Sequence, residues 1–120
     1  MVYFPVIEAY EAQVYLNMTL TSCRVWAEDG YHARIGGDGR DHYHNCDGTA
    51  GYREMIIGTE RDGPNDWYWI IVKTEAGIDD YLHKPFNSHS CVCVAGTVRD
   101  IKISGYPIDA ISRCNVDAAC

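Results

Sequence analysis

Three side chains that could hold a metal ion stand close together in the sequence. His42, His44 and Cys46 are spaced at i, i+2 and i+4, and His32 is nearby. Alternate residues of a strand share a face, so these three could approach one zinc ion. A cysteine in a disulfide offers no thiolate, however, and imidazoles alone would be weak ligands. We therefore interpret this stretch as a polar loop whose cysteine is bridged, and we expect no metal.

The chain also contains the residue types of a small ribonuclease. Such an enzyme needs a general acid, a general base and an arginine for the phosphate. The residues that could take these roles do not have a spacing typical of such a site. They are Glu54, Glu60, Arg53, Arg61, His83 and His89. Hydrolase and metalloprotease motifs are absent, and the glycines at 36–39 lack the lysine of a phosphate-binding loop. We predict no catalytic residues and no cofactor.

Two cysteines stand one residue apart in the stretch "HSCVCVAGTV". On a strand, Cys91 and Cys93 would share one face and Val92 and Val94 the other. The two thiols could bond each other only if the backbone bent, so we expect each to reach a different partner. Six cysteines are an even number and more than a reducing cytosol usually shows, which predicts three disulfides among about 15 possible pairings. They are Cys23, Cys46, Cys91, Cys93, Cys114 and Cys120.

Composition limits the class of partner. The 120 residues correspond to one domain, 1–120, and the net charge is −7, from 17 acidic and 10 basic residues. This balance argues against binding to nucleic acid or to an anionic membrane. No apolar run reaches the roughly 18 residues of a membrane-spanning helix. The start, Met1 to Pro5, looks like an initiator methionine before a mature secreted chain, and Asn17-Met18-Thr19 is a glycosylation sequon at Asn17.

Periodicity predicts an α+β fold. Residues 13–26 alternate as a strand, after a possible helical turn that begins near Pro5. Residues 52–60 and 66–75 flank a turn sequence and predict a β-hairpin, whereas 29–51 is a long irregular segment. Residues 91–104 predict a further strand with a bulge at Gly96, and Pro107 begins a short helix. We expect about four antiparallel strands, with one or two short helices packed on them.

Four residues are candidates for a recognition surface. Trp67 and Trp69 lie just after the turn of the predicted hairpin, with Tyr68 between them, so both faces of that strand carry a large ring. The rings could be buried under a helix or form an exposed patch. Arg34 and Arg40 stand out in the acidic loop and could bind a partner, or could pair loosely with nearby aspartates.

The pattern of strands and cysteines resembles the LARS group of secreted avirulence effectors from plant-pathogenic fungi. The resemblance lies in "CVC" on a late strand followed by "RDIKI", in the terminal cysteine, and in Arg24-Val25-Trp26-Ala27. It implies an antiparallel sheet of about four strands covered by helices and stapled by disulfides, with Cys91, Cys93 and Cys120 as structural half-cystines. Members commonly carry more cysteines than the six of this chain.

The resemblance also implies a function. Members have no established catalytic activity; they act in the host plant and are detected by its resistance proteins. We therefore expect a secreted, monomeric effector that binds a host plant protein, either in the apoplast or after entering host cells. A ribonuclease-like enzyme and a killer-toxin or protease-inhibitor type of module remain the alternatives. Cys91 and Cys93 would tie a central strand to Cys46 and to one of the terminal cysteines.

Overall fold

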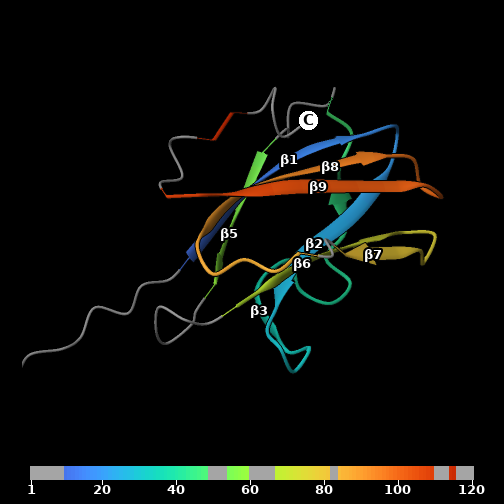
Figure 1. Ribbon diagram of the computed structural model, residues 1–120. Helices are drawn as coiled ribbons and strands as arrows, with labels where there is room; N and C mark the ends of the chain where they lie inside the picture. The colour runs from blue at the N-terminus through green and yellow to red at the C-terminus, as the bar shows by residue number, and fades with distance from the viewer. Residues whose placement is uncertain (1–9, 49–53, 60–66, 82–83, 110–113, 116–120) are drawn as a thin grey trace, which may run out of the picture.

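Strands in two sheets build the protein, and Figure 1 shows the sheets as two layers. The computed structural model describes residues 10–48, 54–59, 67–81, 84–109 and 114–115. In sheet A the strand order is β5-β1-β8-β9; in sheet B it is β3-β2-β6-β7, with β4 also paired to β2. The pair β1–β8 is parallel, and the other pairs are antiparallel. The strands are β1 (Tyr10–Met18), β2 (Ser22–Glu28), β3 (Arg34–Gly37), β4 (His44–Asn45), β5 (Glu54–Thr59), β6 (Trp69–Thr74), β7 (Asp79–Tyr81), β8 (His89–Gly96) and β9 (Ile101–Ile108).

The core lies between the two sheets because each contributes an apolar face. Every second residue of β1 points inward, and Val14 is fully buried. On the opposite sheet, Val25 of β2 and Val72 of β6 are fully buried in the same cluster. Such period-two burial is what two sheets packed face to face require.

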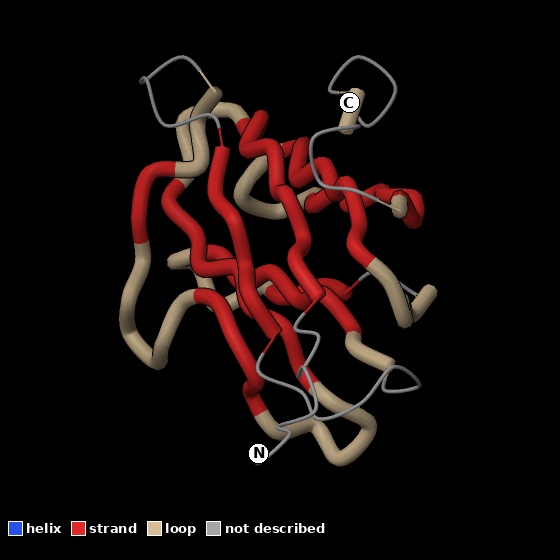
Figure 2. Tube along the Cα trace, turned by 90° about the vertical axis from the view of Figure 1, so that its left-hand side faces the viewer, coloured by secondary structure: helices blue, strands red, loops and turns tan. Residues whose placement is uncertain are grey.

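The predicted α+β class is wrong: the described residues contain no helix and form an all-β sandwich (Figure 2). Pro107, expected to begin a helix, lies in the edge strand β9, where a missing N–H is tolerated. Tyr10 and Val14 suggested a helical turn, but a spacing of four is even and places them on one face of a strand as well. The expected start of that turn, near Pro5, lies outside the described residues.

The strand predicted over 13–26 is two strands in different sheets. The alternation continues to Met18, but Leu20 adopts a left-handed backbone with φ 46° and is exposed. The Leu20 amide donates to Asp47 Oδ2 at 3.1 Å, and the Thr21 hydroxyl donates to the Thr19 carbonyl at 2.6 Å. These hydrogen bonds stabilise the break between the two strands, where the chain leaves sheet A and enters sheet B.

The predicted hairpin of 52–60 with 66–75 is also wrong. β5 pairs with β1 in sheet A, and β6 pairs with β2 in sheet B. Ile57 and Ile70 belong to one core cluster, so these strands contribute to the core from different sheets. A turn sequence indicates that the chain reverses, but it does not decide which strands share hydrogen bonds; the turn itself lies outside the described residues.

The predicted strand over 91–104 is a hairpin of β8 and β9. Gly96, expected as a bulge, ends β8 with φ +92°. A Cβ there would lie 2.1 Å from the Asp100 carbonyl oxygen, so the turn requires glycine. Thr97 and Asp100 close the turn through backbone hydrogen bonds of 3.0 and 3.2 Å.

The face of sheet A that points away from the core carries the "CVC" cysteines. Cys91 and Cys93 pack there with Tyr15 in a second, smaller cluster, whereas Val92 and Val94 face the main core. Cys91 pairs with Cys114, which brings a segment near the C-terminus over this face; their Cα atoms are 5.6 Å apart.

Of the three expected disulfides, two join described residues, Cys91–Cys114 and Cys23–Cys46, and Cys93 is also disulfide-bonded. The expected tie between the 91–93 strand and Cys46 is wrong because Cys46 faces the main core and Cys91 and Cys93 face the other side of sheet A. None of the described cysteines is free, and Cys120 lies outside the described residues.

Candidate functional site

The outer face of sheet B carries an ordered set of aromatic and charged side chains. The inward residues of β2 are Cys23, Val25 and Ala27, so its alternate residues point outward. The register places three outward pairs in adjacent rows: Arg24 opposite Lys73, Trp26 opposite Ile71, and Glu28 opposite Trp69. This face is therefore basic at one end, and it has a carboxylate beside an indole ring at the other.

The end of this face that carries Glu28 and Trp69 is hollowed into a groove. Its volume is about 470 Å³. Trp69 and Ile71 line it from β6, and the end of β2 with the following turn supplies Glu28, Asp29, Gly30 and His32. We call this feature the aromatic groove. An apolar hollow with a few polar groups is the usual form of a binding site.

Internal bonds hold the groove carboxylates in place. Glu28 accepts a hydrogen bond from the Trp26 indole N–H at 2.6 Å through Oε2, and its Oε1 lies 3.6 Å from His32 Nδ1. Asp29 is mostly buried, and its Oδ1 accepts the amides of Tyr31 and Ala33 at 2.8 and 3.0 Å. Asp29 therefore shapes the turn, and Glu28 presents charge to the groove.

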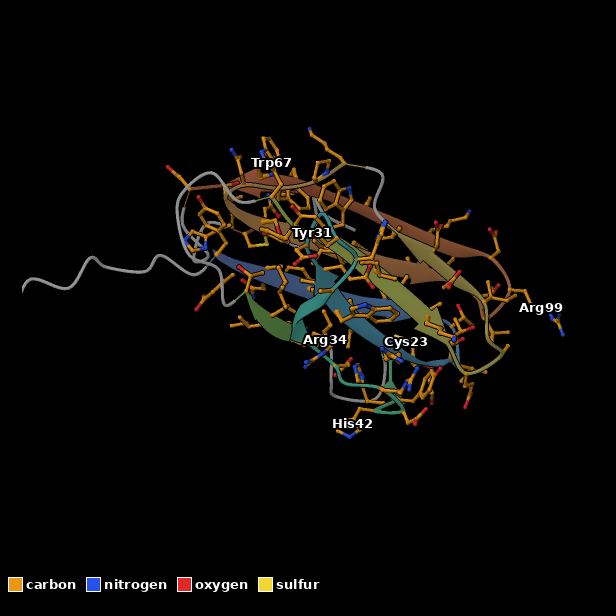
Figure 3. The ribbon with its side chains drawn as sticks, turned by 90° about the horizontal axis from the view of Figure 1, so that it is seen from below. Cys23, Tyr31, Arg34, His42, Trp67 and Arg99 are labelled. Carbon is orange, nitrogen blue, oxygen red and sulfur yellow. A yellow bond between two sulfur atoms is a disulfide. The ribbon has the colours of Figure 1, made fainter. Side chains whose placement is uncertain are left out.

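Two exposed rings lie on chain segments that adjoin the groove residues. The chain after Glu28 runs beside the chain before Trp69, because these residues are register partners at the end of the β2–β6 ladder. Tyr31 is 91 % exposed on one of these segments and Trp67 is 47 % exposed on the other. Figure 3 shows both residues away from the tip that carries Arg99. Large exposed rings gathered around a hollow are typical of a protein-binding surface.

The four predicted recognition residues do not form one patch. Trp69 lines the aromatic groove and Trp67 lies beside it. Arg34 instead begins β3, and Arg40 lies in the loop that follows β3. In Figure 3 Arg34 and Trp67 lie well apart, with Tyr31 between them in this view. Arg34 is exposed, yet its guanidinium donates to the carbonyls of Gly37 and of Asp38, the latter at 2.9 Å. Arg34 thus stabilises its own turn, and Arg40 is exposed in the next one.

Sequence reasoning missed most of the groove. Glu28 and Ile71 were not singled out, and His32 was noted only beside the candidate zinc ligands, although Arg24, Trp26 and Glu28 alternate with buried residues. That alternation was a usable signal for one outward face. The pairing of Glu28 with Trp69 depends on strand register, which the local sequence does not contain.

The residues considered for zinc have other roles in the structure. Cys46 is bridged to Cys23, and the described residues contain no cluster of three or more potential metal ligands. His44 instead hydrogen-bonds to Asp38 Oδ2 through Nε2 at 2.6 Å, and its Nδ1 lies 3.2 Å from the Asn45 carbonyl. Asp38 Oδ2 also accepts the Val25 amide at 2.8 Å. A protonated His44 therefore links β4 to β2 through Asp38.

This link predicts a pH-dependent stability. The hydrogen bond to Asp38 raises the pKa of His44 above its ordinary 6.5, against the opposing effect of burial. Because the folded-state pKa is the higher one, the stabilisation is complete below about pH 6.5 and is lost as the pH rises through the folded-state pKa. Urea unfolding of the parent and of His44→Gln should therefore differ most at about pH 5.5 and converge towards about pH 8.5. His42→Gln, an exposed neighbour, is the control and should show no such trend. A constant difference for His44→Gln would contradict this role.

The residues considered for a ribonuclease are not brought together where the structure describes them. Glu54 lies opposite Tyr15 on β1, and its Oε2 accepts from Gln13 Nε2 at 3.2 Å. His89 lies towards the other end of β1, and its Nδ1 accepts the Glu11 amide at 2.9 Å. The others, at 53, 60, 61 and 83, lie outside the described residues. Glu54 and His44 share a second hollow, but both ring nitrogens of His44 already face Asp38 and Asn45.

The sequon is accessible. Asn17 and Thr19 are exposed at the end of β1, on a different sheet from the aromatic groove. A glycan on Asn17 would therefore project from sheet A.

Comparison with protein-family models, with curated proteins and with solved structures finds no match. In the part of the chain that the structure describes, no helix has the length and apolar character needed to span a membrane.

Proposed function

We propose that the protein is a secreted effector of a plant-pathogenic fungus, which binds a host protein through the aromatic groove and is detected by a plant resistance protein. The observation that carries the binding function is the groove itself, an apolar hollow with Trp69 along it, a fixed carboxylate and exposed rings beside it. Aromatic residues in and around a hollow contribute most to the affinity of many protein interfaces.

Other observations support the effector assignment. The two disulfides between described residues are compatible with an extracellular protein, and the net charge of −7 disfavours nucleic acid and anionic membranes as partners. The resemblance of the cysteine pattern to the LARS group supplies the fungal and plant context. The helices implied by that resemblance are absent from the described residues, so the proposed binding surface comes from this fold and not from the group.

The proposal is tested by the response of host plants. Trp69→Leu keeps an apolar residue but removes the ring, and loss of an aromatic hot spot typically weakens binding by about 30-fold or more. Delivered to a plant that responds to the parent protein, Trp69→Leu should give a strongly reduced response. Ile56→Ser alters a more exposed apolar side chain on sheet A, 58 % exposed, and should leave the response unchanged. Full response to Trp69→Leu, with loss in Ile56→Ser, would place the functional surface on the other sheet.

A further inference from the structure

The chemistry of the aromatic groove indicates which group of the partner enters it. Trp69 lines the groove with an indole ring, and Glu28, its register partner on β2, offers a carboxylate. An indole face attracts cations through its quadrupole, and a carboxylate attracts them by charge and by hydrogen bonding. The pair is therefore suited to a cation more than to an anion.

The same face of sheet B already holds one cation in this way. The Arg24 guanidinium lies over the Trp26 ring, 4.1 Å from its centroid, and the Trp26 indole N–H donates to Glu28. Cation, ring and carboxylate thus follow one another along β2. Trp69 lies across from Glu28, and among the described residues no cation lies over its ring. The groove thus places a second ring beside the same carboxylate.

The electrostatics of Glu28 agree with this role. Its side chain is 19 % exposed, so its charge is less screened than a fully solvated one. Oε2 is engaged by Trp26, whereas Oε1 faces His32, whose side chain is 91 % exposed and can be displaced. The net charge of −7 adds a general attraction for a basic partner.

We propose that the aromatic groove receives a positively charged side chain of the host protein, with its cationic group over Trp69 and beside Glu28. This inference rests on the proposed binding function of the groove. A guanidinium suits the site best, because its flat face stacks on the ring while its edge donates to a carboxylate. The Arg24 guanidinium over the Trp26 ring is the model for the stacking part of that geometry.

The experiment uses the full chain labelled with ¹⁵N and a pair of short peptides. One peptide carries arginine between glycines; in the other, neutral citrulline, which has nearly the same shape, replaces arginine. We expect the arginine peptide to shift the Trp69 indole signal and the backbone amides of residues 28–32. The citrulline peptide should bind about tenfold more weakly, and added salt should weaken the arginine peptide.

Two variants separate the ring from the charge. Trp69→Leu and Glu28→Gln should each weaken the arginine peptide by about tenfold; glutamine still has an oxygen to accept from Trp26. Lys73→Gln changes a residue on the same strand as Trp69 but at the basic end of the face. This variant should not weaken binding of the arginine peptide. Equal binding of both peptides, shifts only at acidic residues outside the groove, or an unchanged affinity in Glu28→Gln would each overturn the inference. If the arginine peptide fails to bind while Trp69→Leu still loses the host response, the proposed function stands and its occupant is not a cation.

Discussion

Gly36→Ala should destabilise the fold by about 3 kcal/mol, the largest effect we expect from a single methyl group. Gly36 lies on β3 at an edge of sheet B and approaches Gly58 of β5 at an edge of sheet A. A Cβ on Gly36 would lie 2.0 Å from the Gly58 carbonyl oxygen and 3.0 Å from its carbonyl carbon. Because both atoms belong to the backbone, no side chain can move aside, and the edges of the two sheets must separate.

Gly58→Ala is the matched control for this substitution. A Cβ on Gly58 meets nothing within 4 Å, so the same chemical change on the other side of the contact should alter the free energy of unfolding by about 0.5 kcal/mol or less. Urea unfolding followed by tryptophan fluorescence measures both variants. Similar stabilities for the two would show that the sheets do not approach each other at this point.

Removal of the Cys23–Cys46 disulfide should cost about 3 kcal/mol from chain entropy and about 1–2 kcal/mol more from packing. Both cysteines are fully buried in the main core, so alanine at both positions leaves space there. The loop that the bridge closes contains Glu28 and His32 of the aromatic groove. We therefore expect the double alanine variant to lose host recognition as well as stability.

Cys91→Ala with Cys114→Ala provides the comparison. Both bridges join residues 23 apart in the sequence, so the chain-entropy contribution is the same for each. Cys114 is only partly buried, and this bridge lies on sheet A, so its removal should cost less in packing and should spare the aromatic groove. Equal losses of stability and of host response in the two double variants would contradict the assignment of the groove to the Cys23–Cys46 loop.

The parts of this structure that follow from the sequence are those set by local alternation. Val14, Leu16, Met18 and Leu20 were expected to share a face. The first three do, because a strand alternates whatever it pairs with, whereas Leu20 lies beyond the end of β1 and is exposed. The opposite faces of Cys91 and Val92 followed from the same rule. The two-sheet arrangement did not follow, since it depends on which strands pair.

The misplaced hairpin shows why the rest could not be predicted. The sequence around 60–66 has turn chemistry, but β5 and β6 pair with other strands, β1 and β2 respectively. The aromatic groove depends on the same choice, because Glu28 meets Trp69 only in the β2–β6 register. Trp69 was identified from its own type, whereas Glu28 and His32 acquire a role only through their neighbours.

Site-specific photo-crosslinking in the host tests most directly that the aromatic groove contacts the partner. Benzoylphenylalanine would replace His32 at the groove or, as the control, Ile56 on sheet A, both of which are well exposed. Each protein is delivered to responding leaves and irradiated, and adducts are detected by mass. We predict an adduct from position 32 that disappears when Trp69→Leu is also present, and none from position 56. An adduct from position 56 alone, or one at position 32 that is unaffected by Trp69→Leu, would contradict the account.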